Sequence, residues 1–546
     1  MGKNRTKRNA LNGNPIKILD MPTFVLPATL VLIAVIAGIA IPQTFNAGAS
    51  MALNFLTTNF GWFYAIGATI LLVFCFWAAF SKAGNVKLGG KDAKPEMKFG
   101  TWFAIVLCSG MAIGISFYGI AEPLANYVAP PVFAGYEGST QEAAEGALKY
   151  AFLHWALHPY AIYTSAGICC AFIIMNGKKK FQVSSSLYPL IGEKANGTLG
   201  KVINSVCIFS LIGGIGTSLG FGITQIATGI NYVFGTHFSS ISLALIIIVV
   251  MATTYILAAC TGILKGIKHV SNFNVLIYLA MLLIAIVFGN TLFIINNTTS
   301  SLGQYLAFLI PQSFYLEPAH QAGWVQNNSV FYWAWWLSFA PLVGLFLVKL
   351  SKGRTIRQFV LVNMIAPALF AIAWFGVFGS AAISMEMSGG NLASEIAQYG
   401  TAVSLFAFAK AIPPTAIFIV LSFGCVALSF ITLAQSMTLT ISEMVVKESE
   451  MEKRIAAGKG APKYLIVFWG VLIGAIAFVL LYSGGLEALQ TSSIVCGLPI
   501  LILLLFMIVS FIKSMKHRSQ YDLTLTSEER EELAELETQK NSNAPI

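Results

Sequence analysis

Two clusters of aromatic residues occur inside strongly apolar stretches of the sequence. One comprises His154, Trp155, Pro159, Tyr160 and Tyr163, and the other is Tyr332-Trp333-Ala334-Trp335-Trp336. The faces of Trp and Tyr rings attract soft, poorly hydrated cations such as a trimethylammonium group. If the two clusters face each other across a helix bundle, they form a cage for a quaternary amine. The alternative is an interfacial belt, because Trp and Tyr are common where helices leave a membrane.

The spacing of the second cluster predicts which of its rings face the same way. Trp333 and Trp336 are three residues apart, which places them on one face of a helix. Phe339 extends that stripe by a further turn. We expect Trp335 to point in another direction.

In the first cluster, Tyr160 and Tyr163 share a helical face for the same reason. Trp155 lies one to two turns earlier in the chain. Pro159 stands between them and perturbs the helix, because proline has no backbone N–H to donate. This perturbation can bring all three rings together.

Ionisable side chains are almost absent from the apolar stretches, apart from His154 and His158. A membrane enzyme needs paired acids or a histidine cluster, a proton pump needs a relay of titratable groups, and a channel is typically lined by rings of charge. Two histidines four residues apart could ligate a metal ion, but the sequence shows no third ligand nearby. We therefore predict that the protein is not an enzyme and has no resident metal or cofactor. A channel or a membrane enzyme remains the remoter alternative.

The elements that must position these residues are membrane helices. The chain has 546 residues, of which 56% are hydrophobic and only 10% charged, whereas soluble domains carry about 25% charged residues. Apolar runs long enough to cross a bilayer recur from end to end. They predict an all-α integral membrane protein with about 12 transmembrane helices, near residues 23–43, 61–81, 101–121, 146–175, 200–233, 239–260, 268–296, 329–350, 357–381, 412–442, 464–483 and 491–512.

Lys and Arg residues predict the orientation of these helices. They gather in the N-terminal tail and in alternate connections, around residues 82–98, 178–180, 349–357 and 447–463. Because positive charge is retained in the cytoplasm, we expect both termini to be cytoplasmic and the protein to be a multi-pass component of the plasma (inner) membrane. The same distribution accounts for the net charge of +10, so we expect no nucleic-acid partner. We expect membrane lipids to surround the protein.

Three segments follow from this topology. Residues 1–22 form a cytoplasmic tail, residues 23–512 the transmembrane domain, and residues 513–546 a second cytoplasmic tail. Thr526 or Ser527 can cap a short acidic helix in the last segment. In the transmembrane domain, a semi-apolar stretch at 302–315 is expected to lie along the membrane surface.

Small residues are concentrated in two of the predicted spans, at 109–115 and 213–222. Such residues let neighbouring helices pack closely. A dense cluster of them can also unwind a helix and expose backbone carbonyl oxygens to a cation, as in discontinuous transporter helices. Both interpretations remain open for both spans.

Several motifs together resemble the betaine/carnitine/choline transporter family. They are Phe331-Tyr332-Trp333-Ala334-Trp335-Trp336-Leu337-Ser338-Phe339-Ala340-Pro341 with Leu350-Ser351-Lys352-Gly353-Arg354, Gly110-Met111-Ala112-Ile113-Gly114 with Ala121-Glu122-Pro123, and His154-Trp155 through Tyr163. The resemblance covers essentially all the spans. It implies a LeuT-type inverted repeat, formed by spans 3–7 and 8–12, and a homotrimer.

The resemblance also implies a site. A box at mid-membrane would comprise Trp155, Tyr160, Tyr163 and Trp336, with Trp333, Trp335 and Phe339 lining an adjacent part of the pathway, beside Gly110, Met111 and Gly114. Gly114 stands where choline-transporting relatives tend to carry Asp. With no carboxylate to balance a net cation, a zwitterion is the expected substrate, and choline is a remoter alternative.

These expectations define a secondary active transporter of small quaternary-ammonium zwitterions, such as glycine betaine or carnitine, that works by alternating access. In sodium-dependent relatives, the matching Na⁺ ligands would come from Cys108, Met111, Phe430 and Thr432. However, Leu433 stands where a second hydroxyl is expected, and Gln435 where Asp is usual. Na⁺-coupled symport is our first hypothesis. Because these two positions depart from the family's pattern, a sodium-independent antiporter is the alternative.

Overall fold

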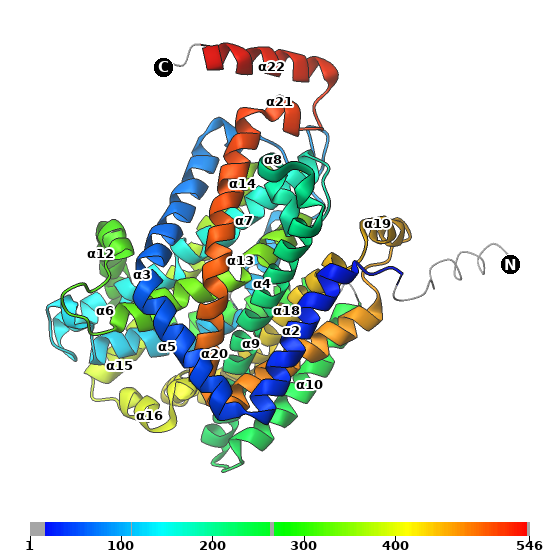
Figure 1. The fold of residues 1–546 in the computed structure, drawn as a ribbon. Coiled ribbons are helices and arrows are strands. Elements are labelled where there is room, and N and C mark those ends of the chain that lie inside the picture. Colours follow the sequence, from blue (N-terminus) through cyan, green and yellow to red (C-terminus); the bar gives the residue numbers. More distant parts are fainter. Residues whose placement is uncertain (1–16, 111, 262–266, 543–546) are drawn as a thin grey trace.

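The computed structural model describes residues 17–110, 112–261 and 267–542, whose regular structure is helical (Figure 1). The longer helices are α2 (Met21–Ala40), α3 (Pro42–Phe80), α4 (Phe99–Gly110), α5 (Ala112–Val128), α6 (Gln141–Trp155), α7 (Leu157–Ala171), α9 (Thr198–Phe234), α10 (Ser240–Cys260), α11 (Lys268–Phe288), α12 (Thr291–Phe314), α13 (Phe331–Leu350), α15 (Ala366–Met387), α18 (Thr415–Met444) and α20 (Lys463–Lys516). Shorter helices are α8 (Tyr188–Ile191), α14 (Ile356–Val360), α16 (Leu392–Tyr399), α17 (Ser404–Ala411), α19 (Glu448–Ala456), α21 (Arg518–Tyr521) and α22 (Ser527–Ser542).

Ten helical stretches in the described part of the chain are long and apolar enough to cross a membrane. The pair α4 and α5, which meet at 67°, makes an eleventh if it counts as one broken span. The prediction of an all-α multi-pass membrane protein is thus confirmed.

Helix α20 is far longer than one membrane crossing requires. Its 54 residues would extend roughly 80 Å at about 1.5 Å per residue, against a hydrocarbon core of about 30 Å. The backbone leaves the helical region at Gly484 (φ −160°, ψ 16°) and at Gly485 (φ 60°, ψ −140°). A positive φ costs glycine little, so the chain turns at this pair, and Figure 1 shows the orange segment changing direction before it rises beside α3.

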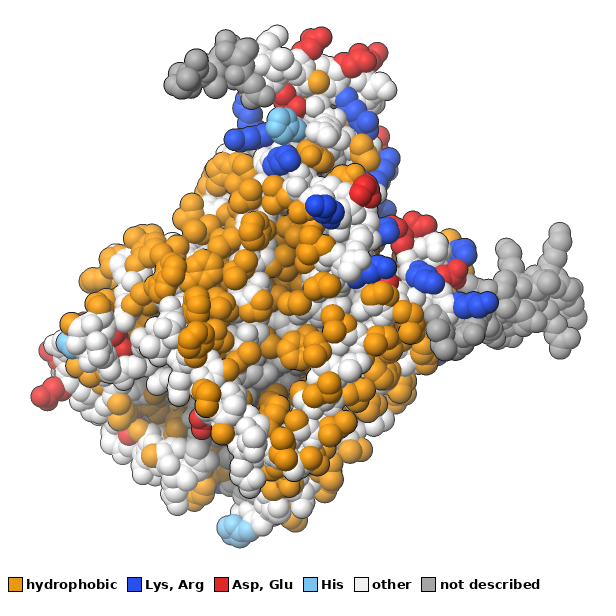
Figure 2. Space-filling model, in the orientation of Figure 1, with side chains coloured by type: hydrophobic (Ala, Val, Ile, Leu, Met, Phe, Trp, Pro, Cys, Tyr) orange, Lys and Arg blue, Asp and Glu red, His pale blue; other side chains and the backbone are white. Residues whose placement is uncertain are grey.

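The centre of the bundle is formed by α13. All of its apolar stretch is buried, whereas only 33% of the corresponding stretch is buried in α10 and in α11. Leu276 and Leu283 of α11 are among the exposed apolar side chains. Figure 2 shows a broad belt of hydrophobic side chains around the middle of the molecule, which suits contact with lipid.

The predicted seventh span, 268–296, ends too late. The helix stops at Phe288, where Gly289 adopts an extended conformation, and α12 begins at Thr291 after the Asn290 side chain accepts a hydrogen bond from Phe293 N. The helix expected at 302–315 is the second half of α12, which packs across α6 and α15. Hydropathy continues through the break, so it gave no sign of it.

The two spans rich in small residues behave differently. In the third span, the described helices α4 and α5 meet at 67°, but Met111 between them lies outside the described part of the chain, so the unwinding interpretation stays a prediction there. The fifth span is one continuous helix, α9, so that interpretation is wrong there. Its glycines allow close packing instead: a Cβ at Gly220 would come within 2.4 Å of Leu489.

The Lys- and Arg-rich connections meet at one end of the molecule. Isolated β-bridges join Leu19 to Val446 and Lys87 to Thr355. The Lys447 ammonium donates to the backbone oxygen of Lys17 at 2.9 Å. In Figure 2, Lys and Arg side chains gather at this end, where the C-terminal helices also lie.

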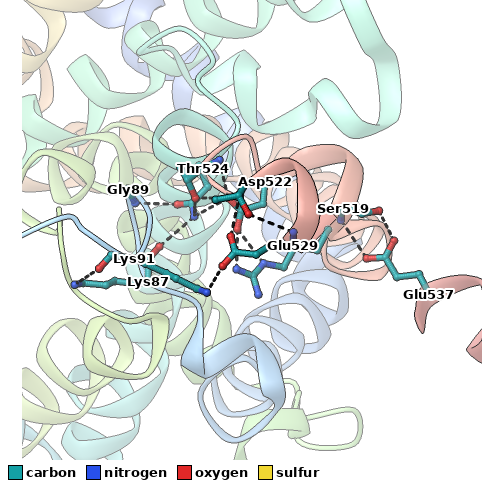
Figure 3. A network of polar contacts seen from close by, with 11 residues as sticks. Lys87, Gly89, Lys91, Ser519, Asp522, Thr524, Glu529 and Glu537 are labelled. Carbon is teal, nitrogen blue, oxygen red and sulfur yellow. Dashed lines mark hydrogen bonds and ion pairs between the residues drawn. The ribbon is translucent and has the colours of Figure 1, made fainter. Parts of the chain in front are cut away.

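The C-terminal tail docks on this end through a buried carboxylate (Figure 3). Asp522 accepts from Asn176 Nδ2 at 3.2 Å, from Thr524 Oγ1 at 2.5 Å and from Arg518 Nε at 2.9 Å. Asn176 ends the fourth span and also accepts from Gly89 N at 3.0 Å. The tail, the second connection and the fourth span are therefore tied together at one point.

Beyond this point, Thr526 caps α22, as predicted. Its hydroxyl accepts from Glu529 N at 3.3 Å, and the Glu529 carboxylate accepts from Thr526 N at 2.9 Å. Glu529 also pairs with Lys91, while Ser519 donates to Glu537. The acidic helix is thus held against the connection after α3.

Candidate functional site

A cavity with about 290 Å³ of empty space lies between the broken third span, α6, α7, α9, α13 and α18. The volume open to the centre of a water-sized sphere is only about 20 Å³, room for about one water molecule, so the rings lie close together in this conformation. The lining residues are Gly110, Ile113, Gly114, Trp155, Tyr163, Ser218, Trp335, Trp336, Phe339 and Leu433. The two aromatic clusters of the sequence therefore meet at one cavity.

Two helix breaks shape this cavity. The two described helices of the third span, α4 and α5, meet at 67°, and the fourth span is interrupted at Ala156, whose φ of −101° and ψ of −108° are not helical. The second break places Trp155 at the end of α6, while Tyr163 follows on α7. The break precedes Pro159 by one turn, which agrees with the disturbance predicted from that proline.

Trp336 is the common neighbour of the rings in the fourth span. Its ring centroid lies 5.5 Å from Trp155, 5.2 Å from Tyr163 and 5.9 Å from Tyr160. The first two pairs are edge-to-face, the geometry that aromatic quadrupoles favour. Tyr160 contacts Trp336 from behind the lining and does not itself border the cavity.

The structure reverses the expected roles of two tryptophans. Trp335 lines the cavity, whereas Trp333 packs against His158 with ring centroids 5.9 Å apart. Trp335 and Phe339 are four residues apart, and Trp336 and Phe339 three, so these rings form the face of α13 that is turned to the cavity. The prediction that Trp335 points away from the cage is wrong.

Glycine is required at one position of the third span, Gly114, because an aromatic ring approaches its backbone. A Cβ at Gly114 would lie 2.5 Å from the Trp155 ring and 3.5 Å from Trp335. A Cβ at Gly110 would lie 3.5 Å from Tyr163, which is ordinary contact. Gly114 thus leaves room for an aromatic ring, and Met111 between these two residues lies outside the described part of the chain.

A second layer of rings covers one end of the cavity. Tyr332 and Tyr118 lie 5.2 Å and 5.7 Å from Trp155, and Phe221 lies 5.2 Å from Trp335. Tyr332 belongs to the first turn of α13, so the layer closes the end of the cavity nearest to that turn. A ligand could leave in this direction only if these rings moved.

One buried carboxylate escaped the sequence-based interpretation. Glu122 is 6% exposed, and its Oε2 accepts from the Trp155 indole nitrogen at 2.6 Å. Its Oε1 lies 2.6 Å from His154 Nδ1. The predicted third span ended at residue 121, before Pro123, but α5 continues through that proline to Val128 and carries Glu122 into the bundle.

Three further lining residues were not predicted: Ile113, which precedes Gly114 in the third span, and Ser218 and Leu433 on other helices. Ser218 belongs to the small-residue run of α9, and Leu433 to α18. Only the packing of distant helices brings them to the cavity. The run of small residues in the fifth span was the one available signal, and it indicated proximity to neighbouring helices rather than a binding role.

The residues proposed for a coupling ion are partly together. The Thr432 hydroxyl lies 3.2 Å from the backbone oxygen of Cys108, a contact that joins α18 to the end of α4. It also lies 3.1 Å from the backbone oxygen of Ser429 in α18 itself. The Phe430 ring is buried against Tyr255, with centroids 6.2 Å apart. In the described ranges, no three His, Cys, Asp or Glu residues cluster as they would around a metal ion.

Comparison with known proteins shows to which transporter family the chain is similar. A model described as "BCCT, betaine/carnitine/choline family transporter" matches residues 22–520. The glycine betaine transporter OpuD of Bacillus subtilis (strain 168) is 35% identical over 516 residues, which cover 94% of this chain and 95% of OpuD. A probable glycine betaine transporter of Desulfitobacterium hafniense (strain Y51) is 35% identical over 496 residues, with 90% and 96% covered. The ectoine/hydroxyectoine transporter of Virgibacillus pantothenticus is 34% identical over 501 residues, with 91% and 97% covered.

Proposed function

Because the chain belongs to the betaine/carnitine/choline transporter family, we propose that it carries a small zwitterion with a quaternary-ammonium head, glycine betaine or carnitine, by alternating access. Members of this family are transporters rather than enzymes, so the chain is a membrane transporter. Relatives named for glycine betaine and for ectoine differ in the head group but share a carboxylate-bearing zwitterion as substrate class.

The observation that carries the proposal is the chemistry of the cavity wall. Trp155, Tyr163 and Trp336 all line this one cavity and offer it ring faces and edges. Such faces attract a trimethylammonium head, whose methyl groups also bury apolar surface against them. No Asp, Glu, His, Lys or Arg side chain belongs to the described lining itself.

Two indole N–H groups in the same wall remain free for a carboxylate. The Nε1 atoms of Trp335 and Trp336 are buried and have no hydrogen-bond partner among the described residues. A buried donor without a partner costs about 1–3 kcal/mol. A substrate carboxylate that accepts from these donors would remove that cost, which favours a zwitterion over a simple cation such as choline.

We also propose twelve spans in the LeuT-type arrangement. Dividing α20 at Gly484 and Gly485 and counting α4 with α5 as one broken span supports this number. Spans 3–7 and 8–12 would then form two halves. Their first members, the third span and α13, both line the cavity, as expected for a site between inverted repeats. The gathering of Lys and Arg at one end supports cytoplasmic termini in the plasma membrane.

For energy coupling we propose symport with Na⁺. The supporting observation is the contact of Thr432 Oγ1 with the Cys108 carbonyl oxygen, beside the break in the third span. These oxygen atoms are of the kind that hard cations prefer. Exchange without Na⁺ is the second candidate, and one observation favours it: Leu433 presents an apolar side chain to the cavity where a further oxygen ligand would otherwise stand.

Transport into proteoliposomes tests the proposal. Purified protein would be assayed with labelled glycine betaine, carnitine, γ-butyrobetaine, choline and ectoine, with and without an inward Na⁺ gradient. We expect uptake of a methylated zwitterion that is driven by Na⁺. Uptake only into vesicles preloaded with a related amine would establish exchange, and uptake of none of the methylated amines would overturn the cage as a binding site.

A further inference from the structure

We propose that Glu122 is a positioning residue that sets both the orientation and the electrostatic potential of the cage through Trp155. The inference rests on the proposed function, because it assigns a role in binding a quaternary-ammonium head. It concerns a side chain that does not itself line the cavity. Glu122 therefore acts on the ligand through another residue.

The geometry shows that both carboxylate oxygens are engaged. Oε2 accepts from Trp155 Nε1 at 2.6 Å, and Oε1 lies 2.6 Å from His154 Nδ1. A carboxylate only accepts, so His154 carries a proton on Nδ1 and donates it. Both distances are short for N–H···O bonds, as expected when the acceptor is charged.

The same interactions continue to α13. His154 Nε2 lies 2.8 Å from Ser329 Oγ in the turn η7 (Gln326–Val330), and the imidazole ring stacks on Tyr332 at 4.7 Å. Glu122 on α5 is thus connected through α6 to the start of α13. The Trp155 ring is fixed between this network and Phe375, on which it stacks at 5.1 Å.

This arrangement changes the chemistry available to the cage. An indole N–H that donates to a carboxylate is polarised so that its ring becomes richer in electrons, because hydrogen-bonded groups polarise one another in a low-dielectric interior. The carboxylate also adds negative potential at the edge of the ring, where it meets the indole nitrogen. Both effects strengthen the attraction between the ring and a quaternary-ammonium head. The rings therefore do not hold the cation alone, contrary to the expectation from sequence.

The substitution Glu122→Gln separates charge from shape. The amide oxygen of Gln can still accept from Trp155, and its NH₂ group can donate to a His154 ring that has changed tautomer. Binding would be measured by intrinsic Trp fluorescence on the purified full-length protein. The two probes are glycine betaine and 3,3-dimethylbutanoate, in which a neutral tert-butyl group replaces the trimethylammonium head.

If Glu122 acts electrostatically, E122Q weakens glycine betaine binding by about tenfold, the loss expected for part of a desolvated cation–π interaction. Binding of 3,3-dimethylbutanoate stays the same or improves, because its head carries no charge. Equal losses for the two probes would reduce Glu122 to a packing role and overturn the inference. Unchanged binding of both probes would overturn it as well.

A double-mutant cycle tests the route through Trp155. Trp155→Phe keeps a ring but removes the indole N–H and leaves only the through-space effect of the charge, so adding E122Q to W155F should cause a further loss of glycine betaine binding clearly below tenfold. A full additional tenfold loss would contradict the inference. Glu317→Gln is the matched control: Glu317 is also buried, and its Oε2 accepts from Val325 N at 3.3 Å on the connection before η7.

Binding measurements on the wild-type protein distinguish a failure of the proposed function from a failure of the inference about Glu122. If it binds no glycine betaine, the proposed function fails and the role of Glu122 fails with it. If it binds glycine betaine and E122Q binds both probes as the wild type does, the inference alone fails.

Discussion

The ring of Trp155 lies directly against the backbone of Gly114, where a Cβ atom would come within 2.5 Å of the ring. The expected effect of Gly114→Ala follows from this contact. Overpacking a well-filled interior costs about 1–3 kcal/mol, and here the strain falls on a ring of the cage. We predict that glycine betaine binding weakens about 10- to 100-fold, measured by Trp fluorescence.

The control for this substitution is Gly303→Ala in α12. A Cβ there meets nothing within 4 Å, and alanine favours a helix. We expect G303A to bind glycine betaine as the wild type does. Normal binding by G114A would mean that Trp155 can move without loss, and that the cage is less rigid than the structure indicates.

The three tryptophans of α13 should differ in their effect on binding. Trp336→Leu removes the ring that contacts Trp155 and Tyr163 and should cost about 2 kcal/mol or more, roughly a 30-fold loss of glycine betaine affinity. Trp335→Leu should have a smaller effect of the same sign. Trp333→Leu should lower thermal stability more than affinity, because its ring packs on His158 outside the cavity.

Titrations of the three variants with glycine betaine, combined with their melting temperatures, check this order. A loss of affinity in W333L as large as that in W336L would contradict the position of the cavity.

The Thr432 hydroxyl should control the response to Na⁺. Thr432→Val keeps the shape of the side chain but removes the oxygen that lies 3.2 Å from the Cys108 carbonyl oxygen. We predict that the Na⁺ concentration for half-maximal uptake rises about tenfold, a typical cost for losing one polar contact to a charge. Uptake at saturating Na⁺ should be less affected.

Thr440→Val on the same helix is the control, since its hydroxyl bonds to the Ser436 carbonyl oxygen at 2.9 Å in the way Thr432 bonds to that of Leu428. If uptake by the wild type does not depend on Na⁺ and T432V behaves like it, exchange becomes the favoured mechanism.

Asp522 should hold the C-terminal tail in place. Asp522→Ala leaves Asn176, Thr524 and Arg518 without the carboxylate that they now contact. Hydrogen bonds to a charged group contribute about 1.5–3 kcal/mol, so we predict that α22 becomes readily accessible to a protease that cleaves after Glu. Hydrogen exchange of residues 523–539 should rise in parallel, while glycine betaine binding should stay within about twofold of wild type.

The Lys91–Glu529 pair predicts a pH dependence for the same tail. Hydrogen bonds from Lys91 and from the Thr526 backbone lower the pKa of Glu529 below its ordinary value. A carboxyl group with a lowered folded-state pKa contributes stability above its unfolded pKa of about 4.3, and the contribution is lost as the pH falls through the lower folded value. Tail protection should therefore be constant from about pH 8 to 5 and decrease only below about pH 4. Glu529→Gln should remove that decrease.

The membrane fold was accessible from sequence because hydropathy reports burial in lipid directly. The cavity was accessible in part because Trp155, Tyr163 and Trp336 carry their chemistry in their own side chains. The sequence could not show that Trp335, rather than Trp333, lines the cavity. Spacing fixes the angle between two residues on a helix but not the rotation of α13 relative to its neighbours.

Glu122 was missed for two physical reasons. The predicted span ends at residue 121, although α5 continues to Val128. The partners that make the carboxylate tolerable in the bundle, Trp155 and His154, are 33 and 32 residues away in sequence. A buried charge is interpretable only together with the groups that solvate it, and those are supplied by the tertiary structure.

The placement of Trp336 has a consequence for turnover. Its ring centroid lies 5.2 to 5.9 Å from those of Trp155, Tyr160 and Tyr163, so in the proposed site the contacts that bind the solute and those that join α13 to the fourth span involve the same rings. Separating these helices to release the solute also separates the rings. Tightening the cage would therefore slow release, and affinity and speed could not be raised independently by changing these residues.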